Sequence, residues 1–293
     1  MSNNTSISAL IKLIDDPDDG IFSHVRREIL NFGPDAIPLL ESSWEEDDYG
    51  LLFQTRIEEI IHDIQFQATK DDIKEWIESD EKNLLQGVFL VAKYQFPELD
   101  LTEIKEEIQN IRKDIWLEIN SSQTIFEQMK AFNEVFFRIH GFQGNTKNYH
   151  SPLNSYLNVV LETRKGNPLT LSVLYSIIAQ SLDLPVFGVN LPNHFVLAYV
   201  DKNKNYLNLG DDDDNSGVLF YINAFSKGAA FNKKEIHQFL KKLNIEEKRE
   251  YFEPCPNTTI IKRMLANLIV GYQQQGNSDK VKDLSELKNL FDN

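Results

Sequence analysis

The chain has 293 residues, of which 41% are hydrophobic and 11% aromatic, so it can bury the core of one or two globular domains. It carries 45 acidic and 30 basic residues, a formal net charge of −15 at pH 7. Because neutralisation of phosphates dominates nucleic-acid affinity, this charge argues against DNA or RNA as a partner, and against an anionic membrane surface for the same reason.

The N-terminal stretch MSNNTSISALIKLI has no basic region and no small-residue cleavage site, so we expect no signal peptide. No apolar run approaches the roughly 20 residues that span a bilayer. Cys255 is the only cysteine, which excludes an internal disulfide and a zinc site made of thiolates. These features predict a cytoplasmic protein with no membrane partner. They leave the oligomeric state open.

The first hundred residues are predicted to be helical. Residues 6–45 contain three helical segments, separated by the break DDPDDG and by the pair Gly33-Pro34. Paired helices joined by an Asp-Pro-Asp turn resemble a single HEAT-like unit, and generic helical packing explains the same pattern. Residues 50–95 indicate two or three further helices.

Isoleucines at helical spacing follow, at positions 104, 108, 111, 115 and 119. They predict one apolar stripe on a helix, which we interpret as a packing surface. Near the C-terminus, TTIIKRMLANLIVGYQQQ and DKVKDLSELKNLF flank the turn residues Gly276, Asn277 and Ser278. This pattern predicts a helical hairpin that resembles one tetratricopeptide-like pair.

Three short apolar segments predict strands: HFVLAYV, NYLNLG and VLFYINAF. The run DDDDNSG, which begins at Asp211, lies between the last two. Four aspartates, Asp211 to Asp214, raise the question of calcium, but the spacing and the downstream glutamate of an EF-hand loop are missing. We interpret the run as a solvated hairpin tip, and we expect neither a metal site nor another cofactor.

The central segment begins with a capped helix. Pro168 suits the first helical position, and Asn167 suits the N-cap before it. Folding alone explains these residues, but a helix start also offers unpaired N–H groups and a partial positive charge to a ligand. His194 follows at the start of the predicted strand HFVLAYV. With an ordinary pKa near 6.5, it can act as a general base or bind a ligand.

The runs YLNVVLETRKGNPLTLSVLY, GVNLPNHFVLAY and FYINAFSKG resemble the transglutaminase-like core 2 family, whose bacterial members include the SirB-one-type proteins. GFQGN and NYHSPLNSYL match the lead-in of that family, and RMLANLIVGYQQQGN is similar to a helical tail that often follows it. The resemblance covers about residues 120–275 and leaves the first hundred residues outside it.

The resemblance and the order helix, strand, strand imply an α+β fold. We expect a transglutaminase/papain-like core, with a helix packed on a small antiparallel sheet, between a helical N-terminal region and a C-terminal helical hairpin. The expected domain boundaries are a helical region at 1–100, the core at 101–250 and the hairpin at 251–293.

In active transglutaminases and their protease relatives the helix opens with Gly-x-Cys, and the resemblance aligns Gly166-Asn167-Pro168 with it, so that a proline stands in the cysteine position. The family's histidine corresponds to His194, and Asn223 occupies the place of the aspartate that orients it. An asparagine can still orient a histidine, as it does in papain-like enzymes. Pro168, however, supplies no nucleophile.

Three other side chains are candidates for a nucleophile. Ser172 lies one helical turn after Pro168 and Thr170 lies between them, but a mid-helix hydroxyl lacks the exposure of a first-turn nucleophile. Cys255 stands between two prolines beyond the core. We therefore expect no covalent thiol chemistry. The predicted binding cleft consists of Arg164, Asn167, Thr170 and Asn193.

Three functions remain open. The first is a non-catalytic transglutaminase-like protein, a regulatory module that binds a protein, a peptide or a small ligand. The second is a hydrolase of amide or ester bonds with His194 as general base. The third is a purely structural helical scaffold. The direction of the imidazole separates them: an imidazole that faces an open cleft near residues 167–169 favours binding or catalysis, and one covered by packed side chains favours the scaffold.

Overall fold

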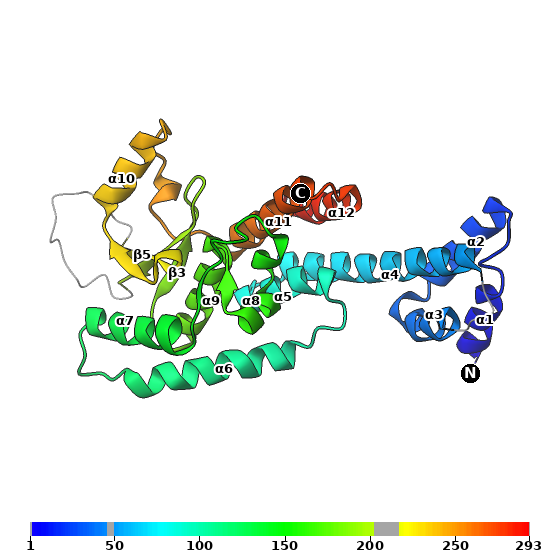
Figure 1. Ribbon diagram of the computed structural model, residues 1–293, viewed down its shortest axis with the longest axis horizontal. Coiled ribbons are helices and arrows are strands. Elements are labelled where there is room, and N and C mark those ends of the chain that lie inside the picture. The colour runs from blue at the N-terminus through cyan, green and yellow to red at the C-terminus, as the bar shows by residue number, and fades with distance from the viewer. Residues whose placement is uncertain (1, 46–49, 202–216, 293) are drawn as a thin grey trace. The chain divides into compact units, whose positions relative to one another are not determined.

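The computed structural model describes residues 2–45, 50–201 and 217–292 (Figure 1). The chain divides within helix α4 (Leu51–Glu78) into two compact units, Met1–Glu75 and Trp76–Asn293. The domain boundaries expected at residues 100 and 250 stay predictions. The predicted strand NYLNLG and the aspartate run lie outside the described residues.

The first unit is helical. Its helices α1 (Ser2–Ile11), α2 (Asp19–Leu30) and α3 (Ile37–Trp44) are followed by the first part of α4, with a short 3-10 helix, η1 (Gly33–Ala36), before α3. Each helix contributes apolar side chains to one core, because each has an apolar face. The members of this core include Ile7, Val25, Ile29, Leu40, Phe53 and Ile57.

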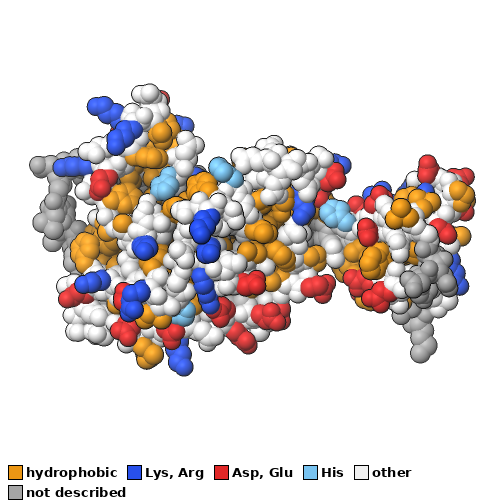
Figure 2. All heavy atoms as spheres, in the orientation of Figure 1, with side chains coloured by type: hydrophobic (Ala, Val, Ile, Leu, Met, Phe, Trp, Pro, Cys, Tyr) orange, Lys and Arg blue, Asp and Glu red, His pale blue; other side chains and the backbone are white. Residues whose placement is uncertain are grey.

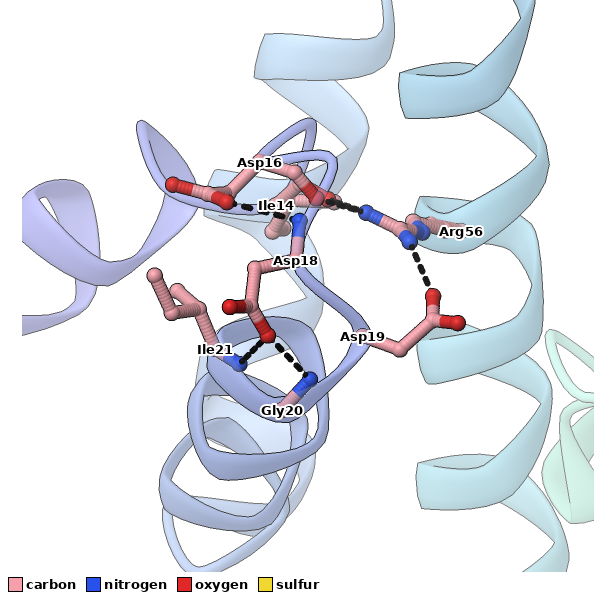
Figure 3. Close-up of polar contacts among 7 residues, drawn as sticks. All are labelled: Ile14, Asp16, Asp18, Asp19, Gly20, Ile21 and Arg56. Atoms are coloured by element: carbon pink, nitrogen blue, oxygen red, sulfur yellow. Dashed lines mark hydrogen bonds and ion pairs between the residues drawn. The ribbon is translucent and has the colours of Figure 1, made fainter.

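The Asp-Pro-Asp turn between α1 and α2 is held by a buried arginine (Figure 3). Arg56, which is 7% exposed, donates from Nη1 to the carbonyls of Ile14 at 2.8 Å and Asp16 at 2.7 Å. Its Nη2 pairs with the Asp19 carboxylate at 3.2 Å, and Asp18 caps the first-turn amides of α2. The cluster of aspartates therefore has a structural explanation, since it caps a helix and balances a buried charge.

The second unit contains the longer series of helices, of which α9 is the central one (Figure 1). Helices α6, α8 and α5 and strands β3 and β4 all pack against α9. The helices of this unit are α5 (Leu84–Gln95), α6 (Leu101–Glu118), α7 (Ile125–Asn133) with its π-helical continuation η2 (Glu134–Ile139), α8 (Leu157–Thr163), α9 (Pro168–Ser181), α10 (Lys233–Lys242), α11 (Asn257–Gln274) and α12 (Ser278–Asn289).

A four-stranded sheet has the order β3-β4-β5-β6, and every neighbouring pair is antiparallel. A two-residue parallel pair joins β1 (Gln143–Gly144) to β2 (Lys165–Gly166). The predicted α+β fold with a helix packed on a small antiparallel sheet is therefore confirmed. The strands of the larger sheet are β3 (Val186–Val189), β4 (Val196–Val200), β5 (Val218–Asn223) and β6 (Ala229–Phe231).

The isoleucine stripe lies on α6. The side chains at 104, 108, 111 and 115 are buried, as their spacing predicts. The fifth, Ile119, is only half-buried, because the helix ends at Glu118 and Ile119 has an extended backbone. The stripe is thus one residue shorter than predicted.

The predicted C-terminal helical hairpin is confirmed as α11 and α12, with Asn277 capping the second helix. Helix α11 packs on α5 and on η3 (Pro152–Ser155). Tyr272 of α11 shares a hydrogen bond of 3.1 Å with Tyr156 and donates to Gln95 at 3.0 Å. This packing brings one face of α11 close to the start of α9. Over the described part of the chain, no helix is long and apolar enough to cross a membrane.

Candidate functional site

The start of α9 is fixed by its cap. Asn167 Oδ1 accepts from the Thr170 amide at 2.9 Å, and Asn167 Nδ2 donates to Ser155 Oγ at 2.8 Å. Pro168 occupies the first helical position, as predicted. The next amide, that of Leu169, has no acceptor within its own helix, because the first turn of a helix leaves its N–H groups unpaired. The cap therefore fixes the helix start, and the Leu169 amide there has no hydrogen-bond acceptor among the described residues.

His194 precedes β4 instead of lying on it, which corrects the predicted placement. The turn before it contains Asn193 in the left-handed region, with φ of 55°, and the His194 amide donates to the Leu191 carbonyl at 3.2 Å. An asparagine tolerates that conformation, which ends the extended chain there. Strand β4 begins only at Val196. A turn thus presents the imidazole.

The structure brings His194 and Asn223 together, as predicted. Asn223 Nδ2 lies 3.3 Å from His194 Nε2, and Asn223 Oδ1 accepts from the Ser226 amide at 3.2 Å. The second bond fixes which end of the amide faces the ring, so the Asn223 N–H₂ donates and Nε2 accepts. Burial lowers the pKa of His194, and the positive charge of Arg263 lowers it further. Both causes favour a neutral imidazole, and the bond from Asn223 to Nε2 places its proton on Nδ1.

His194 lines a cavity of about 210 Å³ at the start of α9. The walls come from four parts of the chain: residues 149–152 with Ser155, residues 167–169, residues 193–195, and the face of α11 from Arg263 to Gln274. A second cavity, of about 480 Å³, shares Asn193 and His194 with the first and also contacts Asn223. Its remaining wall is mostly apolar and includes Val196, Phe231, Ile236 and Phe239.

Arg263 is a residue of this site that the sequence prediction missed. Its Nη1 donates to the Asn190 side chain and, at 2.6 Å, to the Leu191 carbonyl. Its guanidinium also lies 5.7 Å from the centre of the Phe195 ring. The signal in the sequence is weak: Arg263 follows Lys262 in a helix whose next residues are mostly apolar, and a buried arginine needs a partner because buried charge is costly. Its position beside His194 depends on how α11 packs.

The hydroxyls proposed as nucleophiles do not line the cavity. Ser172 and Thr170 are both fully buried, with no exposed surface. Ser172 Oγ donates to the Pro168 carbonyl at 2.7 Å, and Thr170 Oγ1 donates to Asn167 at 3.2 Å. Positions 169–176 of α9 are all buried, so a hydroxyl one turn into the helix is enclosed.

Arg164, predicted as a cleft residue, lies outside the cavity wall. It ends α8 in the left-handed conformation, with φ of 59°, and its guanidinium pairs with Glu107 and lies 4.9 Å from the centre of the Phe142 ring. Of the predicted cleft residues, Asn167 and Asn193 do line the cavity.

Cys255 is also outside the cavity wall. Its amide donates to the Gly188 carbonyl at 2.8 Å, which ties the segment before α11 to strand β3. Burial raises the pKa of the thiol to about 11. A thiol with that pKa is protonated at neutral pH and is a poor nucleophile.

The chain belongs to the transglutaminase-like superfamily, whose family model matches residues 102–266. That match runs from α6 into the first half of α11 and includes the cavity wall except for Asn267, Val270, Gly271 and Gln274. The narrower resemblance to SirB-one-type proteins stays a prediction.

Among its relatives, a UPF0162 protein of Xylella fastidiosa strain 9a5c is 27% identical over 210 residues, 70% of each chain. A UPF0162 protein of Vibrio cholerae is 26% identical over 192 residues, 64% of this chain and 66% of its own. Human F-box only protein 21 is 26% identical over 216 residues, 66% of this chain but 32% of that longer protein. No solved structure matches this chain significantly.

Proposed function

We propose that this chain is a non-catalytic transglutaminase-like protein whose cavity at the start of α9 binds a peptide or a small ligand. One observation carries the proposal: Pro168 lines the cavity beside His194, at the position where the family resemblance places the nucleophilic cysteine. The binding cavity and its histidine are retained, and the group that would attack a substrate is absent from that position.

The surroundings of the site support binding without covalent chemistry. Ser172 and Thr170 are enclosed in α9, and Cys255 is a partly buried thiol with a raised pKa. A nucleophile must be exposed and activated by a neighbouring base, and these three side chains do not meet that condition. The Asn223 amide orients the imidazole, so the pair can donate to and accept from a ligand.

The open cavity argues against a purely structural scaffold. His194 is partly exposed and shares the cavity wall with residues 167–169, so packed side chains do not cover it. Concave sites with a few convergent polar groups are the usual form of a ligand site. With a net charge of −15, regulation by this protein would act in the cytoplasm through a protein or peptide partner and not through nucleic acid. The HEAT-like helices and the tetratricopeptide-like hairpin would be further surfaces for such a partner.

A peptide library selected on the immobilised protein tests the proposal. Asn267 and Val270 of α11 line the cavity, so Asn267→Trp would fill it. Leu117→Trp is the matched control, because Leu117 is 64% exposed on α6 and is not part of the cavity wall. We expect the selected peptides to bind the wild type and Leu117→Trp with equal affinity. They should bind Asn267→Trp at least about tenfold more weakly, which corresponds to a loss of roughly 1.4 kcal/mol of binding free energy. Equal binding to all three proteins would contradict the proposal.

A hydrolase of amide or ester bonds is the second candidate, and the lowered pKa of His194 favours it, because a neutral imidazole can take a proton from water. A positioned general base contributes roughly 10²–10⁴ in rate. Hydrolysis of activated esters by the wild type, lost in His194→Ala and kept in the control His237→Ala, would establish this function. A rate equal to that of His194→Ala would rule it out.

A further inference from the structure

The cavity at the start of α9 is lined by basic side chains, although the chain as a whole is acidic. Its wall contains Arg263, His150 and His194, and none of its described residues is an aspartate or a glutamate. The chain as a whole has 45 acidic residues, and they are prominent on the surface over α6 (Figure 2). The long-range field of the protein therefore repels anions, and any preference of this cavity for an anion must come from short-range hydrogen bonds.

Arg263 is held in one orientation and still has free donors. The hydrogen bonds from Nη1 to Asn190 and Leu191 anchor one end of the guanidinium. Its Nε and Nη2 groups have no hydrogen-bond partner among the described residues, and neither is an enclosed atom. A guanidinium has five N–H donors in a planar fork that matches the two oxygens of a carboxylate. Fixing one end in advance lowers the entropy lost on binding.

The other polar groups of the wall are also arranged as donors. The Asn223 amide bonds to Nε2 of His194, which leaves Nδ1–H to donate elsewhere. The Leu169 amide at the start of α9 is a further unpaired donor, and the helix dipole adds to its attraction for negative charge. At about 210 Å³ the cavity is smaller than the roughly 300–1,000 Å³ of common ligand sites, so it suits one side chain better than a nucleotide.

We propose that this cavity binds a carboxylate of a peptide, either an acidic side chain or the C-terminus, with Arg263 as the principal contact. This inference rests on the proposed function, because it names the ligand of the same site. The peptide carboxylate would accept from the guanidinium fork while the rest of the residue lies against Phe195 and the start of α9.

Three probes separate the sources of the carboxylate. N-acetyl-glutamate α-amide carries only a side-chain carboxylate, N-acetyl-glutamine carries only a C-terminal one, and N-acetyl-glutamine amide carries none. Each is titrated into the millimolar range against ¹⁵N-labelled full-length protein, and the Leu169 amide and the histidine resonances are followed by NMR. We expect saturable shifts with at least one of the two carboxylates. The probe without a carboxylate should leave the resonances in place.

Arg263→Gln should weaken that binding about tenfold or more, because a hydrogen bond to a charged group contributes roughly 1.5–3 kcal/mol. Lys262→Gln is the matched control, because it removes the same charge from the adjacent residue. Lys262 pairs with Asp292 and is not in the cavity wall, so this variant should bind the carboxylates like the wild type. If Arg263→Gln fails to fold, Asn267→Trp, which keeps the arginine and fills the cavity, should abolish the shifts.

The outcomes distinguish this inference from the proposed function. Binding of all three probes with equal affinity, or of the carboxylates equally by wild type and Arg263→Gln, would overturn carboxylate recognition and leave a ligand-binding cavity. Absence of shifts with either carboxylate would also overturn it. A different result would contradict the proposed function: library peptides that bind the wild type and Asn267→Trp with equal affinity.

Discussion

Replacing Pro168 with cysteine restores a nucleophile where the family resemblance expects one. The new thiol would stand at the first position of α9, in the cavity that His194 lines. A thiolate there is stabilised by the helix start, by a neighbouring imidazole and by the charge of Arg263. The pKa of the thiol should therefore fall below its free value of about 8.5.

The native Cys255 provides an internal standard for the size of the effect. At pH 7 a thiol with a pKa of 8.5 is about 3% thiolate, whereas Cys255, with its pKa raised to about 11, is about 0.01% thiolate, a ratio of roughly 300. The less basic thiolate is intrinsically a weaker nucleophile, by about 13-fold for a Brønsted coefficient near 0.45. The new cysteine should thus react at least about 20-fold faster than Cys255.

The assay is alkylation by iodoacetamide at pH 7, with each cysteine quantified by peptide mass spectrometry in Pro168→Cys. Pro168→Ser is the control for the loss of the proline itself, and a second substitution, His194→Gln, should slow labelling of the new thiol but not of Cys255. If the Pro168→Cys thiol reacts no faster than Cys255, the cavity lacks the geometry that activates a nucleophile, and the expected fall in the pKa of the new thiol is wrong.

Three further predictions concern single groups. Arg56→Met should destabilise the first unit by about 2–4 kcal/mol in chemical denaturation, because it leaves one buried and one partly buried carbonyl unpaired. Arg26→Met, which breaks the half-exposed ion pair with Asp63, should cost under about 1 kcal/mol. Equal losses would contradict the role of Arg56. The pKa of His194 is lowered in the folded protein, so the unfolded chain binds more protons, and the free energy of unfolding should fall as the pH drops below about 6.5. His194→Gln should remove this contribution to the pH dependence of stability. An unchanged pH dependence in His194→Gln would contradict the prediction. Asn223→Asp should raise the pKa of His194, measured by NMR titration, because a carboxylate beside the ring favours its charged form. An unchanged pKa would show that the two side chains do not pair.

The parts of the fold that depend on local chemistry could be predicted from the sequence. The start of α9 follows from Asn167 and Pro168, since capping needs only neighbouring residues. The hairpin of α11 and α12 follows from two apolar helical patterns and the turn between them. The pairing of His194 and Asn223 followed from the family resemblance, because strand spacing alone does not show which residues meet.

Features that depend on tertiary packing could not be predicted. The face of α11 that carries Arg263 reaches the cavity only because α11 packs on α5 and η3. Ser172 is enclosed because other elements surround α9, which periodicity along one helix does not show. His194 lies in a turn because Asn193 adopts a left-handed conformation, and the run of apolar residues after it concealed that turn.

The central claim is that the cavity binds a peptide without transforming it, and the mass of a bound peptide tests this most directly. A library peptide that contains glutamine and binds the wild type is incubated with it and with a primary amine, and both peptide and protein are then weighed by mass spectrometry. We expect both masses to be unchanged, even after prolonged incubation. Four changes would contradict this claim if iodoacetamide or His194→Ala prevents them. They are loss of ammonia from the peptide, gain of the amine, cleavage of the peptide, and an acyl adduct on the protein.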